Sequence, residues 1–162
     1  MTSKGIKVFL RPIKSDDGKR LKAFFYTLSP ETVYHRFLTP IKEVTDEQVR
    51  PFVEIDYDNH MALAALDGLE GRILGVARYY KKGPDEADIA VVVTDQWQGK
   101  GIGTLLIKKL CDWGKSQGIR VFNSVVDPEN LRLLKFARSL GFRASTRFVE
   151  GTLQIVCKID ER

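Results

Sequence analysis

Asp88-Ile-Ala-Val-Val-Val-Thr-Asp-Gln-Trp-Gln-Gly-Lys-Gly-Ile-Gly-Thr104 is the stretch that decides the fold. Residues 89–93 form a continuous apolar, mostly β-branched run, which predicts a strand buried on both faces. After it, apolar side chains recur at helical spacing on one face, at Ile102, Leu105, Leu106, Leu110 and Trp113. Gly99, Gly101 and Gly103 lie between the two patterns, where a helix N-terminus offers free N–H groups and its positive dipole end. We therefore expect a strand–loop–helix unit that binds phosphate.

The spacing of the glycines narrows the kind of phosphate ligand. A nucleotide P-loop needs a glycine pair of different spacing followed by Lys-Ser/Thr, which Gly99, Gly101 and Gly103 do not supply. The dinucleotide fingerprint places its third glycine further along than Gly103 and adds an acidic residue after a second strand, which is not evident. Neither nucleotide motif is present in this form.

Length and composition indicate an ordinary globular protein. The 162 residues predict a single domain, 1–162, with 43% hydrophobic and 10% aromatic side chains. No apolar run approaches the roughly 20 residues of a membrane span, and no signal-peptide pattern precedes the first strand, so we expect no membrane association. Cys111 and Cys157 form neither a disulfide framework nor a metal-ligand spacing, which indicates a reducing cytoplasm and no metal.

The net charge of +5 is spread along the chain. Residues 1–81 carry 13 basic and 11 acidic side chains, and residues 82–162 carry 13 and 10. A nucleic-acid module would cluster its basic residues and interleave them with aromatic ones, so we expect no nucleic-acid partner. A modest positive balance still suits a strongly anionic ligand.

The expected elements follow one order: strand, two or three helices, three strands, helix, strand, helix, two strands. The strands are expected at residues 6–12, 60–66, 73–80, 88–94, 121–126, 142–148 and 152–159. The helices are expected after Ser15 and Asp16, after the Ser29-Pro30 cap, at the capping box Thr45-Asp-Glu-Gln48, from Ile102 to Ser116, and from Asp127-Pro128 to Gly141. This order predicts an α+β fold with an α/β/α layered arrangement.

Two motifs resemble the GNAT family of N-acetyltransferases. Gln98-Gly-Lys-Gly-Ile-Gly103 is similar to its Gln/Arg-x-x-Gly-x-Gly/Ala signature, and Asp127-Pro-Glu-Asn130 with Leu140-Gly-Phe142 resembles its Asn-x₁₀-Gly-Phe segment. The resemblance covers the whole chain. It implies a mixed, mostly antiparallel sheet of six to seven strands with a central parallel pair and flanking helices, and acetyl-CoA as cosubstrate.

The resemblance also implies which residues bind the cofactor. The pyrophosphate would lie on the glycine loop, and the pantetheine arm would pair with the strand at 88–94 where the strand at 121–126 diverges from it. The N–H of Val92 or Val93 would then stabilise the thioester oxyanion. The expected cofactor-binding residues are Val91, Val92, Val93, Gln98, Gly99, Lys100, Gly101, Ile102, Gly103, Thr104 and Asn130.

Transfer to an amine needs a base, because a lysine amine with a pKa near 10.4 is neutral in roughly one molecule in a few thousand at pH 7. Asp88 is the first candidate, since related protein-lysine acetyltransferases carry a glutamate at the start of this strand. Glu86, two residues earlier on the same strand face, is the second. Many family members protonate the leaving thiolate with a tyrosine at the position of Ala137, so no general acid is assigned here.

The acceptor is open between two classes of amine. Residues 28–38 and 55–58 resemble the protein-lysine acetyltransferase branch, whose related domains modify acyl-CoA synthetases or a chromatin protein. We therefore expect a protein lysine as acceptor, with a small amine or amino acid as the alternative, and either a monomer or a homodimer. A catalytically weak coenzyme A sensor is the non-enzymatic alternative, suggested by Ala137 in place of tyrosine.

Overall fold

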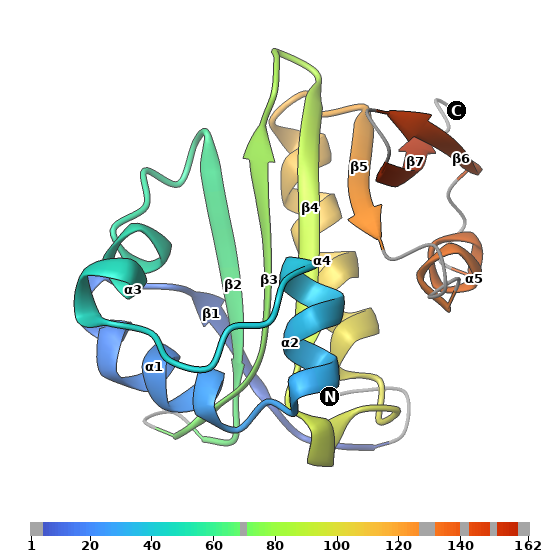
Figure 1. Ribbon diagram of the computed structural model, residues 1–162. Helices are drawn as coiled ribbons and strands as arrows, with labels where there is room; N and C mark the ends of the chain where they lie inside the picture. Colours follow the sequence, from blue (N-terminus) through green and yellow to red (C-terminus); the bar gives the residue numbers. More distant parts are fainter. Residues whose placement is uncertain (1–4, 69–70, 127–131, 140–142, 150–151, 159–162) are drawn as a thin grey trace.

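Seven strands form one sheet in the order β1-β2-β3-β4-β5-β7-β6 (Figure 1). The computed structural model describes residues 5–68, 71–126, 132–139, 143–149 and 152–158. The strands are β1 (Phe9–Pro12), β2 (His60–Leu66), β3 (Ile73–Lys81), β4 (Glu86–Val93), β5 (Val121–Val126), β6 (Arg143–Val149) and β7 (Thr152–Lys158). The helices are α1 (Gly18–Tyr26), α2 (Pro30–Phe37), α3 (Asp46–Val53), α4 (Ile102–Ser116) and α5 (Arg132–Ser139), with 3₁₀ turns η1 (Ser15–Asp17) and η2 (Asp95–Trp97).

All neighbouring strands pair antiparallel except β4 and β5, which are parallel. The predicted mixed sheet with a central parallel pair is confirmed. The parallel connection runs through α4, which crosses the back of the sheet, as a parallel pair requires. Both β4 and β5 are interior strands, so the pair lies at the centre of the molecule (Figure 1).

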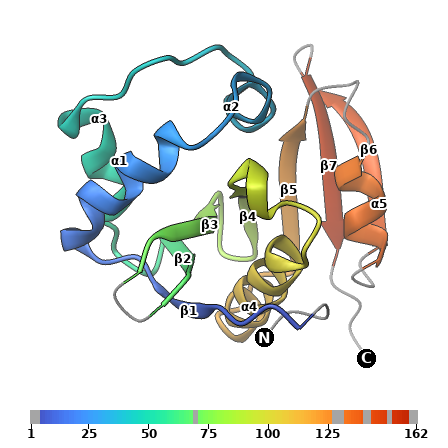
Figure 2. The ribbon, with the colours of Figure 1, turned by 90° about the horizontal axis from the view of Figure 1, so that it is seen from below.

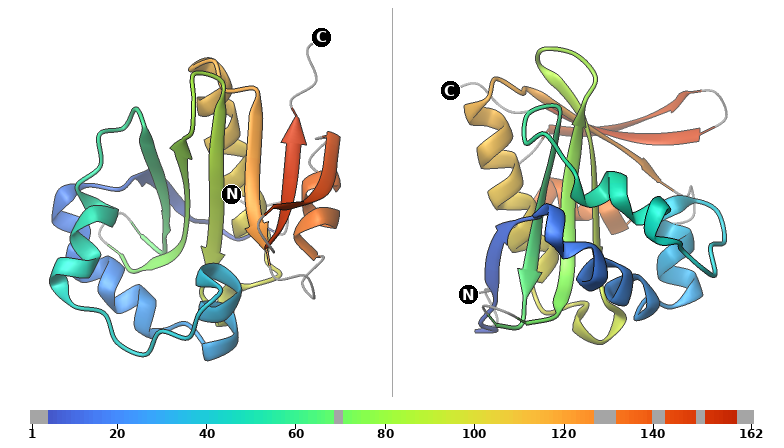
Figure 3. Two further views of the ribbon diagram at one scale, coloured as in Figure 1. Left: turned by 45° about the horizontal axis from the view of Figure 1, so that its top comes forward. Right: turned by 90° about the vertical axis from the view of Figure 1, so that its left-hand side faces the viewer.

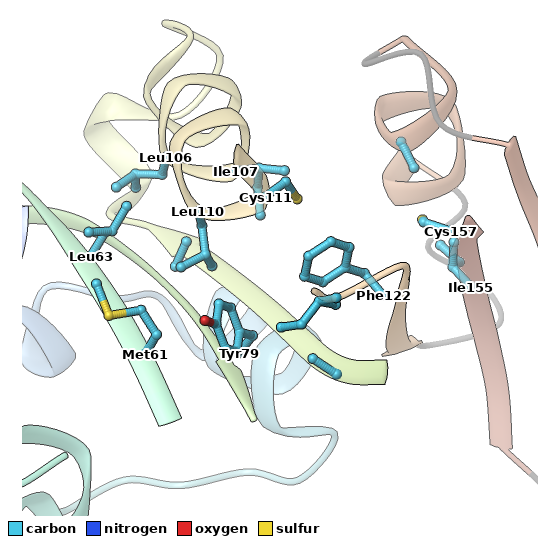
Figure 4. Packing of buried hydrophobic residues seen from close by; sticks show 14 of the residues in the cluster. Met61, Leu63, Tyr79, Leu106, Ile107, Leu110, Cys111, Phe122, Ile155 and Cys157 are labelled. Atoms are coloured by element: carbon cyan, nitrogen blue, oxygen red, sulfur yellow. The ribbon is translucent and has the colours of Figure 1, made fainter. Parts of the chain in front are cut away.

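Helices cover both faces of the sheet. α1, α2 and α3 lie on one face, and α4 and α5 lie on the other (Figures 2 and 3). The core is correspondingly divided into two clusters of buried side chains, one on each face. In the larger one, Met61, Leu63 and Tyr79 of the sheet lie beneath Leu106 and Leu110 of α4 (Figure 4). Side chains therefore alternate along β4 between the α4 face and the α1–α3 face.

The apolar face of α4 differs in part from the predicted one. Its buried residues are Ile102, Leu106, Ile107, Leu110, Cys111 and Gly114. Two members of the expected stripe differ: Leu105 is only half-buried and Trp113 is 42% exposed. Gly75 on β3 lets α4 approach closely: a Cβ there would lie 3.1 Å from Leu106 Cδ1 and 3.3 Å from Ile102 Cγ2.

The N-terminal helices confirm two predicted caps and move one boundary. Ser29 Oγ accepts from the Thr32 N–H at 3.2 Å, and Thr45 with Gln48 forms the reciprocal capping box. α1 instead begins at Gly18, because a 3₁₀ turn occupies residues 15–17. The carboxylate of Asp17 in that turn accepts two hydrogen bonds from Arg11, at 2.7 and 2.8 Å.

The described residues can also be compared with what a membrane span, a metal site and a disulfide would require. No helix in the described ranges is long and apolar enough to cross a membrane. Within the same ranges, no group of three or more His, Cys, Asp or Glu side chains is arranged to hold a metal ion. Cys111 and Cys157 are both buried and free, and burial raises the pKa of the Cys111 thiol to about 12.

Candidate active site

The glycine loop between β4 and α4 ends in a helix start that has no side-chain cap. Gly99 and Gly101 have φ angles of +74° and +90°, a left-handed conformation that costs other residues about 1–2 kcal/mol. Gly101 is the N-cap of α4 and has no side chain to accept a hydrogen bond. The Leu105 N–H donates to the Gly101 oxygen at 3.1 Å, which is the first hydrogen bond within the helix. The N–H groups of the residues before Leu105 are therefore not used in hydrogen bonds within the helix. This terminus can therefore bind an anion.

The side chains of the loop leave the space in front of these N–H groups open. Ile102 turns its side chain into the core, with 1% exposed, so it offers only its N–H. At Gly103 a Cβ would contact the Cγ2 atoms of Val93 and Val91, at 3.7 and 3.9 Å. Lys100 is half-buried beside the loop. An anion at this position would meet backbone donors with few side chains in the way.

β4 and β5 pair over only three residues and then separate. Residues 86–88 of β4 pair with residues 121–123 of β5, and no further β4–β5 pair follows in the described part of the two strands. Figure 1 shows the two strands diverging from this pairing toward the glycine loop. The divergence explains why residues 89–93, which were predicted to be buried on both faces, are only half-buried. The edge of β4 that faces β5 is open there.

The hydrogen bonds to β3 fix which backbone groups of β4 face this opening. The Lys82 N–H donates to the Glu86 oxygen at 2.8 Å, and the Thr94 N–H donates to the Leu74 oxygen at 2.9 Å. The backbone N–H and C=O groups of successive residues in a strand point to opposite sides. Those of every even-numbered residue of β4, Val92 included, therefore point toward β3. The N–H groups of the odd-numbered residues, those of Val91 and Val93 among them, therefore point toward β5 and the opening. The Val93 oxygen confirms this direction, since it accepts from Gln98 Nε2 at 2.9 Å.

The opening forms a mostly apolar slot that passes between β4 and β5. It is lined by His35, Arg36, Ile89, Ala90, Val91, Ile107, Cys111, Phe122, Ser124, Val125, Phe136, Ala137, Ile155 and Cys157. Its lining includes residues of α2 from one face of the sheet and residues of α4 and α5 from the other. Figure 2 shows these helices on either side of β4 and β5. Figure 4 shows Ile107, Cys111 and Phe122 together on the α4 side. Among the described lining residues, Ser124 carries the hydroxyl group.

A second cleft continues from the slot to the glycine loop. It is lined by Glu31, Thr32, His35, Arg36, Val91, Val92, Val93, Asp95, Gln98, Gly103 and Phe136. Five of the residues predicted to bind the cofactor therefore share one cleft. Gly99, Lys100, Gly101, Ile102 and Thr104 complete the loop and the first turn of α4 beside it. Asn130 lies outside the described residues.

Asp88 and Glu86 lie at the other end of β4, where β5 is still paired. Both are even-numbered, so their side chains project from the same face, as predicted. Asp88 Oδ2 forms an ion pair with Lys82 Nζ at 3.2 Å and is 39% exposed. Glu86 Oε1 accepts a hydrogen bond from Nδ2 of the buried Asn123. Asp88 is thus paired with an exposed lysine, whereas Glu86 is bound by a buried asparagine.

Asp95 connects the glycine loop to α2. Its carboxylate accepts from the Ser29 N–H at 2.9 Å, the Ser29 hydroxyl at 2.7 Å and the Thr32 hydroxyl at 3.0 Å. Burial alone would raise the pKa of Asp95, but these hydrogen bonds outweigh it and lower the pKa. Gln98 Nε2 also donates to Thr32 Oγ1, at 3.2 Å. The position of α2 over the slot is therefore coupled to the loop.

The acidic segment at residues 54–58 is a hydrogen-bonded turn. Asp56 Oδ1 accepts from the N–H groups of Asp58 and His60, at 3.0 and 2.9 Å, and these bonds lower the pKa of Asp56. Asp58 forms an ion pair with Lys81 at 2.9 Å. These carboxylates are used in local contacts.

Sequence reasoning missed several residues of this site. Lys82 and Asn123 were not expected beside the two carboxylates, and neither was Asp95 beside Ser29. Arg36 was included only as part of the segment 28–38, and no role was predicted for Arg78. Arg78 is nevertheless 4% exposed in the middle of β3. A charged residue inside an otherwise apolar strand was the signal that could have identified it.

Comparison with known proteins gives a consistent result. The pattern of the acetyltransferase (GNAT) family matches residues 27–142. Acetyltransferase PA5475 of Pseudomonas aeruginosa is 32% identical over 158 residues, covering 96% of this chain and 84% of the relative. Acetyltransferase Pat of Mycolicibacterium smegmatis is 30% identical over 135 residues, covering 82% of this chain but only 40% of the relative.

Two further matches show the range of similar proteins. The crystal structure of the GNAT domain of S. lividans PAT superimposes with a TM-score of 0.84 at 28% identity, covering 94% of this chain and 90% of that one. An L-methionine sulfoximine/L-methionine sulfone acetyltransferase of Pseudomonas aeruginosa is 31% identical over 80 residues, 46% of each chain.

Proposed function

The chain belongs to the GNAT family of acetyltransferases, and we propose that it transfers the acetyl group of acetyl-CoA to a lysine side chain of a protein. The family uses acetyl-CoA as cosubstrate. The observation that carries the proposal is the divergence of β4 from β5, with the glycine loop at one end of the opening and Asp88 at the other. One extended molecule could span these two ends.

Acetyl-CoA would bind along β4 in the direction from the loop to Asp88. The pyrophosphate would accept hydrogen bonds from the first N–H groups of α4. The pantetheine arm would extend β4 by pairing with the open backbone groups of Val93 and then Val91. The thioester would reach the region of Val91, whose N–H points into the slot and is nearer to Asp88. We assign the oxyanion contact to the Val91 N–H, because β3 occupies the N–H of Val92 and Val93 lies beside the loop.

Asp88 would accept the proton that the attacking amine releases. The neutral amine attacks the carbonyl carbon and forms a C–N bond, and the carbonyl electron pair moves to the oxygen beside the Val91 N–H. One proton then leaves the nitrogen, through a water molecule, for the Asp88 carboxylate. The C–S bond breaks as the carbonyl re-forms, and coenzyme A leaves as a thiolate.

The thiolate would leave without a tyrosine acid. Ala137 is buried in the wall of the slot, and Ser124 contributes the nearby hydroxyl among the described lining residues. A thiol with a pKa near 8.5 is a tolerable leaving group as its anion, so water can supply the proton after the C–S bond breaks. Ser124 would donate a hydrogen bond to the thiolate in the meantime.

A protein lysine is favoured as acceptor by the branch that this chain resembles. Residues 28–38 and 55–58 resemble the protein-lysine acetyltransferase branch, and both Acetyltransferase Pat and the GNAT domain of S. lividans PAT match this chain over most of its length. The competing acceptor is a small amine or amino acid. Its support is the similarity to the methionine sulfoximine/sulfone enzyme, which covers 46% of the chain.

Labelled acetyl-CoA separates these acceptors. The protein is incubated with isotopically labelled acetyl-CoA and either a whole-proteome extract or a panel of free amino acids and amines. Released thiol measures turnover, and mass spectrometry locates the label. We expect labelled lysines in a small set of proteins. Turnover with free amines alone would reject the protein acceptor, and tight acetyl-CoA binding with no turnover would support the sensor alternative.

A further inference from the structure

Two arginines, one buried and one half-buried, lie next to each other on the α1–α3 face of the sheet. Arg78 projects from the middle of β3 and is 4% exposed, and Arg36 projects from the last turn of α2 and is half-buried. Both line one apolar cavity beneath α1, α2 and α3. Burial lowers the pKa of Arg78 to about 10, so its guanidinium remains charged at neutral pH.

Among the described residues, no carboxylate forms an ion pair with Arg36 or Arg78. Arg78 Nη1 donates to the Phe52 oxygen at 3.1 Å and to His60 Nε2 at 3.0 Å. A side-chain hydrogen bond with Tyr80 adds to these contacts and favours the charged form of Arg78. A buried positive charge without a negative partner is costly, and two neighbouring ones repel each other.

The other neighbours offset only part of this cost. The guanidinium carbons of Arg78 and Arg36 lie 4.9 and 4.7 Å from the ring centroids of Phe52 and Phe37. The C-terminal end of α2 also favours a cation at Arg36. His60 can only accept from Arg78 as a neutral imidazole, and burial, helped by the charge of Arg78, lowers its pKa to about 4. None of these groups supplies the negative charge of an anion.

The arginines lie beside the position where the thioester would bind. Arg78 is the cross-strand partner of Ala90, so the two side chains are neighbours on the same face. Ala90 lines the slot, and Arg36 lines the slot, the cleft and the apolar cavity. Arg36 therefore borders the slot directly, and Arg78 lies next to Ala90, whose side chain is only a methyl group.

We propose that Arg36 and Arg78 form a carboxylate-binding subsite next to the thioester, an inference that rests on the proposed acyl transfer. Guanidinium groups bind carboxylates through paired, charge-assisted hydrogen bonds. The aromatic and aliphatic remainder of the cavity, with Phe24, Phe25 and Val92, suits a short hydrocarbon chain. The subsite thus selects a substrate that carries a carboxylate a few methylene groups from the reacting carbonyl or amine.

Two substrates can bring a carboxylate to this subsite, and two measurements distinguish them. Calorimetry compares the binding of succinyl-CoA and acetyl-CoA, which tests a carboxylate on the donor. Kinetics with acetyl-CoA compare two lysine peptides that differ by Glu or Gln beside the lysine, which tests a carboxylate on the acceptor. In one of these pairs we expect the wild-type protein to prefer the carboxylate by about 10- to 100-fold, the strength of a charge-assisted hydrogen bond.

Variants then assign the preference to the arginines. Arg36→Met and Arg78→Met keep the length and apolar stem of the side chain and remove the charge, so we expect the preference to fall below about twofold in both. Arg78 lines neither the slot nor the cleft, so Arg78→Met should also retain acetyl-CoA binding. Arg78→Lys should keep part of the preference. Arg50→Met is the matched control, because Arg50 is an exposed arginine on α3 that pairs at 4.0 Å with Glu54.

The outcomes separate the subsite from the proposed function. Arginine-dependent succinyl-CoA binding without any acyl transfer would support the subsite and reject the transferase activity. A wild-type protein that shows no carboxylate preference in either pair would overturn the subsite, whether or not the variants fold. A preference that survives in both methionine variants would overturn it as well.

Discussion

The two ends of β4 are built in different ways. At its C-terminal end, the opening and the helix start present backbone N–H groups, and glycines clear the space in front of them. At its N-terminal end, the site consists of side chains from separate elements: Asp88 with Lys82, and Glu86 with Asn123 from β5. The first end depends on the path of the backbone, and the second depends on which side chains meet across the sheet.

This difference predicts how each end responds to mutation. A backbone site is disturbed by changes in φ or by an added Cβ, and conservative side-chain changes beside it matter little. A side-chain site responds to the loss of one charge or hydrogen-bond partner.

Asp88→Asn should reduce kcat by about 100- to 10,000-fold, because it removes the general base and leaves the cofactor contacts intact. The acetyl-CoA Kd, measured by calorimetry, should change less than about twofold. Glu86→Gln is the matched control and should cost less than about tenfold, since Glu86 is engaged by Asn123. A larger loss in Glu86→Gln than in Asp88→Asn would assign the base to Glu86.

Gly101→Ala should weaken acetyl-CoA binding by about 10- to 100-fold, because a Cβ strains the left-handed cap and displaces the first N–H groups of α4. Gly118→Ala is the control: Gly118 has nearly the same φ, +92°, at the other end of α4. Both variants should lower Tm by a similar amount, and only Gly101→Ala should change the calorimetric Kd. An equal loss of acetyl-CoA affinity in both variants would show that backbone strain weakens binding, and that Gly101 itself makes no contact with acetyl-CoA.

Asp95→Asn should lower kcat/KM about threefold, because it weakens the connection between the glycine loop and α2. The pKa of Asp95 is lowered in the folded protein, so its contribution to stability is complete above the unfolded pKa of about 3.9 and is lost as the pH falls through the folded value. Thermal unfolding between about pH 5 and pH 3 should therefore show a smaller loss of Tm in Asp95→Asn than in the wild type. Identical acid profiles would show that Asp95 does not hold α2.

Lys82→Met should raise kcat/KM for a cationic lysine acceptor by about twofold at low salt, because the exposed lysine no longer competes for Asp88. At an ionic strength of about 0.5 M the difference should disappear by screening. Lys109→Met, an exposed lysine on α4, is the control and should have no effect at either salt concentration. A salt-independent effect would point to a structural role for Lys82.

The cofactor end was predictable from the sequence for a physical reason. Glycine spacing, the β-branched run and the change of period at Ile102 are local properties of the chain, and they fix a backbone path within 17 residues of sequence. The predicted strands, the Ser29 cap and the Thr45 capping box are local in the same sense. The half-burial of residues 89–93 was not predictable, because it results from the direction of β5 about 30 residues later.

The acceptor end was less predictable. Arg78 lies on β3, Lys82 in the β3–β4 connection and Asn123 on β5. Their meeting with His60, Asp88 and Glu86 follows from the strand register. The segment at 54–58 carries three carboxylates, a pattern that is compatible with attracting a cation or with forming a turn, and its hydrogen bonds identify a turn. The sequence also does not show which valine N–H faces the slot. N–H groups alternate in direction along β4, but one hydrogen bond to β3 must be known before any of them can be assigned to a side.

By itself, the sequence determined the layered α+β fold, the strand–loop–helix unit and the family to which the chain is similar, because spacing and periodicity are properties of neighbouring residues. Only the tertiary structure decided that β4 and β5 separate after Asp88, that the Val91 N–H points into the slot, and that Arg36 and Arg78 line one cavity without an ion-pair partner in the part of the chain that is described. These features depend on strand register and on packing between elements remote in sequence, which no local pattern specifies.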